Sequence, residues 1–260
     1  RGRTQRAHQR SHRHHPDLGA DQVLVEQVLE DELVGRSGMN SRSVVPAPVN
    51  EPILSYAPGS PERAKFFARL NEMKARKADV PLSIGGEEIR TGKKIELRSP
   101  YDHAQILGWA HLGGAAEARR AIAAALKARK EWASLPFAAR AAIFLKAADL
   151  LAGDWRWTIN AATMLCQSKN LHQAEIDSAC ELIDFLRFNA RFAEGIYAAQ
   201  PDSSRGVWNR LEYRPLEGFV YAVTPFNFTA IAGNLPTAPA LMGNTIVWKP
   251  AASTLYTANF

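Results

Sequence analysis

The sequence predicts an α/β protein in which a helical block precedes the first strands of a nucleotide-binding sheet. Two segments near the C-terminus carry this prediction, residues 218–228 (GFVYAVTPFNF) and 244–250 (NTIVWKP), because each has the pattern of a short buried strand. The first delivers Asn227 at its C-terminal end, and the second delivers Lys249. Ligands of open α/β sheets bind beyond the carboxyl ends of parallel strands, so we expect both side chains in one crevice.

Helices are predicted through most of the remaining chain. Residues 60–63 (SPER) mark a helix start, because Ser60 suits the N-cap and Pro61 the first helical position. We expect this helix to reach about Lys77. Apolar residues recur at helical spacing in four further segments: 115–132, 138–151, 157–164 and 173–196. The last of these is apolar almost all round, which is typical of a helix buried inside a larger protein.

Short β-like segments lie between these helices. Three of them follow the first helix and are separated by turns at GGEE and Pro-Tyr-Asp: residues 80–84, 94–98 and 104–111. They predict a small antiparallel element rather than a parallel sheet. After the last helix, residues 199–206 predict a loop and residues 207–215 a β-ribbon strand.

Composition narrows the class of protein. Of the 260 residues, 46% are hydrophobic and 22% charged, which is ordinary for a globular protein, and no apolar run approaches the ~20 residues of a membrane span. The net charge of +6 is not gathered into a Lys/Arg stripe with interleaved aromatics, so we expect neither a nucleic-acid partner nor a membrane partner. Two cysteines do not indicate a disulfide framework, which favours a reducing, cytoplasmic compartment.

The N-terminal 38 residues differ in composition from the rest. Residues 1–16 hold five Arg and four His with no acid, and the first methionine is Met39. A targeting segment or a basic arm is one interpretation. The alternative, which we favour, is a non-native segment upstream of a start at Met39. We expect disorder at 1–16, an isolated helix at 22–34, and an extended Pro/Ser/Asn-rich arm over 39–62.

Several longer motifs resemble those of the aldehyde dehydrogenase superfamily. EYRPLEGFVYAVTPFNF is similar to that superfamily's entry into its Pro-aromatic-Asn-Phe loop, and GNTIVWKP to its second nucleotide-domain strand. KARKEW, FLKAADLLAG, QAEID, ELIDFLRFNA and APALMGN most resemble the monofunctional 1-pyrroline-5-carboxylate dehydrogenases, also called L-glutamate γ-semialdehyde dehydrogenases. The resemblance covers about residues 45–260. It implies that 63–217 is the N-terminal helical/β part of the fold and that 218–260 begins an NAD-binding domain that is incomplete here.

The resemblance implies a chemistry. Members oxidise an aldehyde to a carboxylate with NAD, through attack of a Cys thiolate, a thiohemiacetal and hydride transfer to the nicotinamide. The substrate would be L-glutamate γ-semialdehyde, oxidised to L-glutamate in proline degradation. The family's catalytic Cys, catalytic Glu, Gly-rich turn and substrate-anchor loop lie downstream of these motifs. We therefore expect a fragment that is inactive by itself, from a homo-oligomeric parent that is cytoplasmic, or in the mitochondrial matrix of a eukaryote.

Two other functions stay open at this point. Another aldehyde dehydrogenase subfamily would share most of these motifs and differ in its substrate-anchor loop. A non-catalytic, truncated binding protein would keep the partial domain and lose the chemistry.

Asn227 and Lys249 are the strongest site candidates. Asn227 matches the family's oxyanion-stabilising Asn, and a side-chain amide donates an N–H at any working pH. The structural alternative is an Asn that bonds its own turn backbone. Lys249 matches the Lys that contacts the adenosine ribose, and its alternative is a surface Lys that ends a strand.

The remaining cofactor candidates carry less specific signals. Thr224 and Pro225 match loop backbone near the nicotinamide ribose. Many members carry an acid three residues after the ribose Lys, but Ala252 stands there and leaves Ser253 as a substitute ligand. The loss of that acid also leaves NADP open beside NAD. We expect no metal site.

Substrate-pocket candidates come from the subfamily resemblance. Glu175 and Phe228 match positions near the substrate, where a carboxylate would complement the ammonium of glutamate semialdehyde. The alternatives are a solvated helical acid for Glu175 and a core aromatic for Phe228. Lys169 and His172 are interpreted as surface or packing residues. Cys166 and Cys180 lie in apolar helical surroundings, which indicates small hydrophobes rather than nucleophiles.

Overall fold

Helices dominate the described chain, and its strands are short. The structure is a computed structural model that describes residues 43–260, which form one unit, so the predictions for 1–38 and 39–42 lie outside the described residues. The α-helices are α2 (Pro61–Ala75), α3 (Ala115–Ser134), α4 (Phe137–Ala152), α5 (Trp155–Gln167), α6 (Leu171–Ala174), α7 (Glu181–Ala198), α8 (Thr229–Leu241) and α9 (Leu255–Ala258). The strands are β1 (Ala78–Val80), β2 (Leu82–Ile84), β3 (Glu87–Ile89), β4 (Lys94–Arg98), β5 (Ile106–His111), β6 (Val220–Val223) and β7 (Ile246–Lys249). Within residues 43–260, none of the helices combines the length and hydropathy needed to cross a bilayer.

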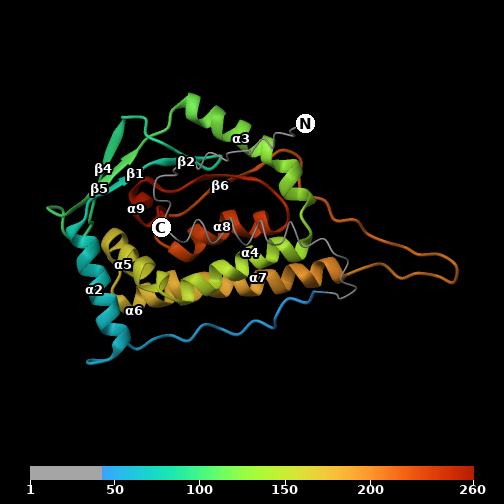
Figure 1. Cartoon of the computed structure of the whole chain (residues 1–260), viewed down its shortest axis with the longest axis horizontal. Coiled ribbons are helices and arrows are strands. Elements are labelled where there is room, and N and C mark those ends of the chain that lie inside the picture. The colour runs from blue at the N-terminus through green and yellow to red at the C-terminus, as the bar shows by residue number, and fades with distance from the viewer. Residues whose placement is uncertain (1–42) are drawn as a thin grey trace, which may run out of the picture. The chain divides into compact units, whose positions relative to one another are not determined.

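The segment before α2 is extended, as predicted for the described part of the arm. Figure 1 shows it as a blue coil, not an arrow, that runs along the long helices. Acidic side chains accept hydrogen bonds from its backbone: Val45 N donates to Glu194 (2.8 Å), Glu51 N to Asp184 (2.7 Å) and Leu54 N to Glu175 (2.9 Å). The residue numbers of the acceptors decrease as those of the donors increase. The arm therefore runs antiparallel to α7, and carboxylates satisfy donors that lack a neighbouring strand.

Helix α2 begins where the sequence predicts. The Ser60 hydroxyl accepts a hydrogen bond from Arg63 N at 3.3 Å, and Pro61 occupies the first turn. The helix ends slightly earlier than Lys77, at Ala75, because Arg76 already takes an extended conformation.

The first β region is mixed, so the prediction of a purely antiparallel element was wrong. β5 pairs with β4 antiparallel but with β1 parallel, while β2 and β3 form a separate hairpin. Only the two glycines of the predicted GGEE turn form the hairpin turn, because Glu87 and Glu88 belong to β3. The expected strand 80–84 is split at Pro81, which has no N–H to donate to a ladder. Gly108 permits the β1–β5 pair: a Cβ there would lie 2.1 Å from the Ala78 carbonyl oxygen.

The predicted helix 173–196 is interrupted. Residues Glu175–Cys180 form a π-helix, η1, between α6 and α7. The Ser178 hydroxyl bonds back to the Ala174 carbonyl and also to Asn160 Oδ1 at 2.7 Å, and such back-bonding opens the helical ladder. Helix α7 then packs between α4 and α8, where Gly233 approaches Leu182 so closely that a Cβ would lie 2.7 Å from its methyl group. Buried side chains of these helices form one apolar core. Figure 1 shows the helices lying together.

The predicted β-ribbon strand at 207–215 is wrong. Residues 199–217 leave the helices as an irregular excursion, seen in orange in Figure 1. The Gln200 side chain takes the place of a strand partner, since its Oε1 accepts from Leu211 N at 2.8 Å and its Nε2 donates to Leu211 O at 3.4 Å. Tyr213 donates to Ala199 O at 3.0 Å. Side chains therefore hold the two arms together without a backbone ladder.

The second β region confirms the predicted parallel pair. β6 and β7 run parallel with Val220 beside Ile246 and Val223 beside Lys249, and α8 connects them. A strand, a crossover helix and a parallel strand make one unit of a doubly wound α/β fold. A short 3-10 turn, η2 (Ala252–Thr254), and α9 follow β7.

Candidate functional site

The carboxyl ends of β6 and β7 meet, as the sequence analysis expected. Thr224 N donates to Lys249 O at 3.3 Å just beyond the last register pair, so the two strands end at one edge. Lys249 is exposed there, and Asn227 is exposed in the loop that leads from β6 into α8. The parallel pairing therefore brings the two strand ends together. Lys249 is the last residue of β7, and Asn227 lies in the loop that follows β6.

The side-chain amide of Asn227 is available to a ligand. Among residues 43–260, it makes no hydrogen bond, so the alternative in which Asn227 satisfies its own turn does not describe the structure. Its backbone carbonyl, by contrast, accepts a hydrogen bond from Lys169 Nζ. An amide that is exposed while its backbone is held can donate an N–H to an oxyanion without titrating.

Lys169 is more deeply placed than a surface residue. Its side chain is 17% exposed, its ammonium pairs with Asp177, and the ammonium lies 4.5 Å from the centroid of the Phe228 ring. Phe228 itself is 40% exposed, so it is not a core aromatic. His172 is exposed, as expected of a surface residue.

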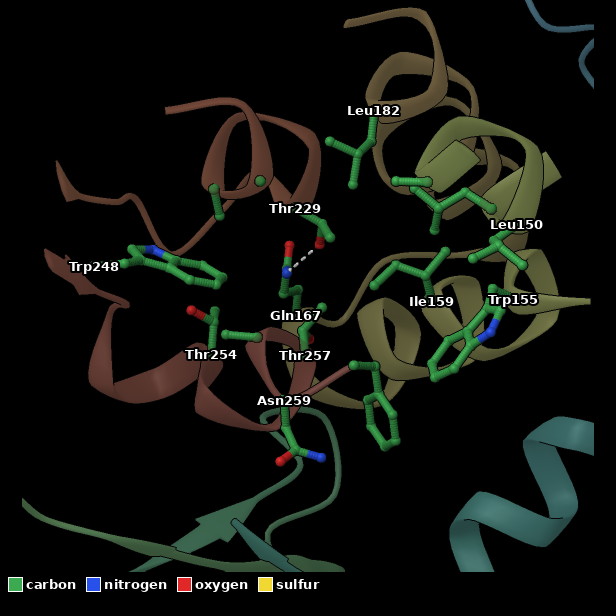
Figure 2. Close-up of a pocket in the computed structure, with 16 residues that line it drawn as sticks. Leu150, Trp155, Ile159, Gln167, Leu182, Thr229, Trp248, Thr254, Thr257 and Asn259 are labelled. Carbon is green, nitrogen blue, oxygen red and sulfur yellow. Dashed lines mark hydrogen bonds between the residues drawn. The ribbon is translucent and has the colours of Figure 1, made fainter. Parts of the chain in front are cut away.

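The start of α8 is anchored to α5 beside this loop. The Thr229 hydroxyl bonds to Thr163 Oγ1 at 2.8 Å and accepts from Gln167 Nε2 at 2.7 Å, and Figure 2 shows the second of these bonds. A largely apolar cavity of about 440 Å³ opens next to it, between α4, α5, α8 and the C-terminal residues. Asn227 and Lys249 do not line this cavity, but Thr229, Trp248 and Thr254 do, so it borders the strand-end site.

Glu175 is fully buried, so the interpretation as a solvated helical acid was wrong. Its carboxylate accepts from Arg156 (Nε 3.1 Å), Tyr56 OH (2.6 Å), Asn160 Nδ2 (2.7 Å) and Leu54 N (2.9 Å). Burial raises the pKa of Glu175, but the hydrogen bonds from Arg156 and Tyr56 outweigh burial and leave it below its ordinary value. Every acceptor position is thus engaged by the chain itself, and the substrate-pocket role of Glu175 stays a prediction.

A second carboxylate, Glu181, escaped the sequence analysis. It is the first residue of α7, is exposed, and forms no ion pair within residues 43–260. Partial burial and the neighbouring charge of Asp177 raise its pKa, while Lys169 opposes them. Sequence gives no signal that Glu175 is paired and Glu181 is not, because the partners of Glu175, Tyr56 and Arg156, lie 119 and 19 positions away in the chain.

The cofactor candidates form a polar edge. Lys249 and Ser253 are exposed at and after the end of β7, whereas Thr224 is buried and accepts from Trp248 Nε1 at 3.0 Å. Pro225 is half-buried. An exposed ammonium and an exposed hydroxyl at the carboxyl edge of parallel strands suit the ribose hydroxyls of a dinucleotide. The side chain of Thr224 is committed to Trp248, so only its backbone is free for such a contact.

Neither cysteine has the character of a nucleophile. Cys166 and Cys180 are both buried, and burial raises the pKa of each thiol, to about 12 for Cys180. A raised pKa disfavours the thiolate, which is the nucleophilic form of cysteine. In the described part of the chain, no group of three or more His, Cys, Asp or Glu side chains could hold a metal ion.

Comparisons with known proteins agree with this architecture. The aldehyde dehydrogenase family matches residues 88–260. A delta-1-pyrroline-5-carboxylate dehydrogenase of Agaricus bisporus is 53% identical over 214 residues, which are 82% of this chain and 39% of that protein. A mitochondrial delta-1-pyrroline-5-carboxylate dehydrogenase of Emericella nidulans is 50% identical over 213 residues, 81% of this chain and 37% of that protein.

A solved structure is similar over the same region. The crystal structure of the delta-pyrroline-5-carboxylate dehydrogenase from Mycobacterium tuberculosis, bound with NAD, matches with a TM-score of 0.83 and 53% sequence identity. The match covers 85% of this chain and 42% of that chain, so this chain spans about two fifths of the length of the relatives it matches. The strand-end geometry, the mixed α/β architecture and the match over residues 88–260 lead to one conclusion: the chain belongs to the aldehyde dehydrogenase family.

Proposed function

We propose that this chain supplies part of the active site of an NAD-dependent dehydrogenase that oxidises L-glutamate γ-semialdehyde to L-glutamate. This aldehyde is the open form of 1-pyrroline-5-carboxylate, so the step belongs to proline degradation. The observation that carries the proposal is the side-chain amide of Asn227, which makes no hydrogen bond within residues 43–260 while Lys169 holds its backbone, near the strand edge where Lys249 is exposed. Identity of 53% to a dehydrogenase of that name supports the choice of substrate.

Asn227 would act on the aldehyde oxygen. As a thiolate adds to the aldehyde carbon, the carbonyl oxygen gains negative charge, and a fixed amide N–H stabilises that charge more than the neutral carbonyl. The proposal assigns the thiolate and the catalytic carboxylate to the length of the relatives that this chain does not span. The burial of Cys166 and Cys180, and the pKa values that burial raises, argue against either as the nucleophile.

Lys249 and Ser253 would hold the cofactor by its ribose. Their ammonium and hydroxyl are exposed at the carboxyl edge of β6 and β7, and the backbone of Thr224 and Pro225 passes along that edge. NAD, when bound, supplies the hydride acceptor. The 218–260 segment is then the beginning of the NAD-binding domain.

The substrate ammonium needs a carboxylate with free oxygens. All the acceptor positions of Glu175 are engaged. Glu181, by contrast, is exposed and interacts electrostatically with Lys169. The Lys169 ammonium in turn contacts the ring of Phe228. The proposal therefore assigns Glu181, rather than Glu175, to the ammonium of glutamate semialdehyde. Phe228 would form the apolar wall beside the aldehyde chain.

The central experiment uses the complete protein that contains these residues. NADH formation from glutamate semialdehyde is measured for wild type, Asn227→Ala and Asn209→Ala, the last being an exposed Asn in the 199–217 excursion. We expect Asn227→Ala to lower kcat by about 10²–10³ with NAD binding unchanged, and Asn209→Ala to leave kcat unchanged. Equal kcat for wild type and Asn227→Ala would remove the oxyanion role.

The substrate and the cofactor are tested by the same assay. Turnover of other aldehydes but not of glutamate semialdehyde would replace the substrate with that of another aldehyde dehydrogenase subfamily. Lys249→Met is expected to raise KM for NAD while kcat stays near wild type, since the ribose contact is remote from the reacting carbon. The 260-residue chain alone is expected to show no turnover.

The proposal also covers the oligomeric state and the cellular location. The excursion 199–217 exposes large apolar side chains, Val207, Trp208 and Leu216 at 56%, 82% and 66%, and such a patch supports a homo-oligomer. Relatives such as that of Emericella nidulans are named mitochondrial, which supports a mitochondrial matrix location, with the cytoplasm as the alternative. Light scattering of the complete protein and fractionation of the source cell test these two points.

A further inference from the structure

Lys169 joins three separate parts of the site. Its ammonium pairs with Asp177 of the π-helix, donates to the Asn227 carbonyl, and lies 4.5 Å from the Phe228 ring centroid. The Asp177 side chain is 7% exposed, so the Lys169–Asp177 ion pair is shielded from water. Water therefore competes little for its charge-assisted hydrogen bond. The ammonium is thus held from one side by a carboxylate and presents its remaining donors to the Asn227–Phe228 backbone.

The segment that carries Lys169 is itself fixed on both sides. Ser168 takes the left-handed conformation, with φ of 57°, directly after α5. Asn170 then caps α6 in a reciprocal pair with Gln173, at 2.9 Å and 3.0 Å. A non-glycine residue in the left-handed region costs free energy and persists only where its surroundings over-determine it. Lys169 is therefore presented by a short, tightly defined turn.

The same end of α5 also holds the residue after the loop. Thr163 and Gln167 lie on one face of α5, and both bond to the Thr229 hydroxyl, at 2.8 Å and 2.7 Å. Figure 2 shows the bond from Gln167. Together with Lys169 they attach the loop at two points: the turn after α5 holds the Asn227 carbonyl, and α5 holds the first residue of α8. The intervening backbone has little freedom to rotate between two such attachments.

From these contacts we infer that Lys169 is a positioning residue, which fixes the backbone of Asn227 so that its side-chain amide is aimed at the reacting oxygen. The inference rests on the proposed function, since it assigns Lys169 a role in a reaction that the complete protein performs. A bond to the Asn227 carbonyl fixes the peptide plane after Asn227 and thereby the direction of its Cα–Cβ bond. Asp177 holds the ammonium in place and partly neutralises it, so Lys169 acts through geometry rather than as the oxyanion's counter-charge.

The first test measures the loop itself in the 260-residue chain and needs no activity. Chymotrypsin cleavage after Phe226 and Phe228, which are 64% and 40% exposed, is compared with cleavage after Trp208, an 82% exposed internal reference. Loss of a charge-assisted hydrogen bond in Lys169→Met should speed cleavage in the loop by on the order of 10-fold, because cleavage follows the population of the opened loop. Lys127→Met, at an exposed position of α3, is the matched control.

Two further variants keep this test decisive if Lys169→Met does not fold. Lys169→Arg retains a cation and should restore most of the protection. Asp177→Asn retains the ammonium and removes its anchor, so it should speed loop cleavage in the same direction. Equal loop cleavage in wild type, Lys169→Met and Asp177→Asn, with far-ultraviolet circular dichroism unchanged, would overturn the inference.

The second test is a double-mutant cycle in the complete enzyme. We expect Lys169→Met to lower kcat by about 10-fold with KM for NAD unchanged, and to have almost no further effect when Asn227 is already Ala. A role limited to general packing would instead lower kcat equally in both backgrounds, and that result would refute positioning. If the wild-type enzyme shows no turnover, the proposed function is wrong. The cleavage test still decides whether Lys169 holds the loop.

Discussion

The buried carboxylate of Glu175 allows a prediction about stability that can be worked from its contacts. Glu175→Gln removes one charge and keeps the side-chain volume, so no cavity forms. The variant weakens the bonds from Arg156, whose side chain is 3% exposed, and places an NH₂ group among donors from Tyr56 and Asn160. Breaking a buried pair by neutralising one partner costs about 3–5 kcal/mol, and we expect about 3 kcal/mol here because Glu51 still pairs with Arg156 at 2.5 Å.

The assay is urea unfolding at neutral pH, followed by circular dichroism, with Glu181→Gln as the matched control. Glu181 is exposed at the start of α7, where a substitution of this kind should change the free energy of unfolding by no more than about 0.5 kcal/mol. A loss in Glu175→Gln no larger than that in Glu181→Gln would refute the structural role given to the Glu175–Arg156 pair.

The pH dependence gives the same prediction a second check. A carboxyl whose folded pKa is below its unfolded pKa stabilises the protein above the unfolded value, and this contribution is lost as the pH falls through the folded value. The pKa of Glu175 is lowered from an ordinary value of 4.5, since the bonds from Arg156 and Tyr56 outweigh the burial that raises it. The difference between wild type and Glu175→Gln should therefore be full at pH 7 and shrink below pH 4.5. A difference that grows on acidification contradicts the assignment.

Other substitutions test local features of the fold. Gly108→Ala should lower Tm and separate β1 from β5, since its Cβ would lie 2.1 Å from the Ala78 carbonyl oxygen; normal thermal unfolding of this variant would show that the pair is not needed. Ser60→Ala should cost about 0.5–2 kcal/mol in urea unfolding by removing the N-cap of α2, and a neutral result would contradict the cap. Cys166 and Cys180 should react with a thiol reagent at pH 8 only at the rate of unfolding, because burial raises both pKa values, to about 12 for Cys180; fast labelling in native buffer would contradict their burial.

Local signals in the sequence were sufficient for several elements. The N-cap at Ser60 and the GG hairpin turn depend on residues a few positions apart, and the structure has both. β6 and β7 were predicted from short apolar runs that end in polar residues, and the structure pairs them in parallel. Helix α8, which connects them, was not among the predicted helices. Pro81 also signalled the break between β1 and β2, but the apolar run around it masked that signal.

Tertiary contacts decided the rest, because the deciding groups are far apart in the chain. Lys169 and Asn227 are separated by 58 positions, and Leu54 and Glu175 by 121, so no local pattern shows that they meet. The free energy of a buried charge depends on its partners, and a buried Glu175 carboxylate would be strongly destabilising without Arg156. The spacing of apolar residues along a helix does not show which residue is that partner. The sequence alone thus predicted most of the helices and the two strands that lead to Asn227 and Lys249, but not α8, the π-helix or the irregular course of residues 207–215. Only the packing of α5 against the loop and of the arm against α7 determined which polar side chains are free for a ligand, since a donor or acceptor is free only when no distant group has already bonded it.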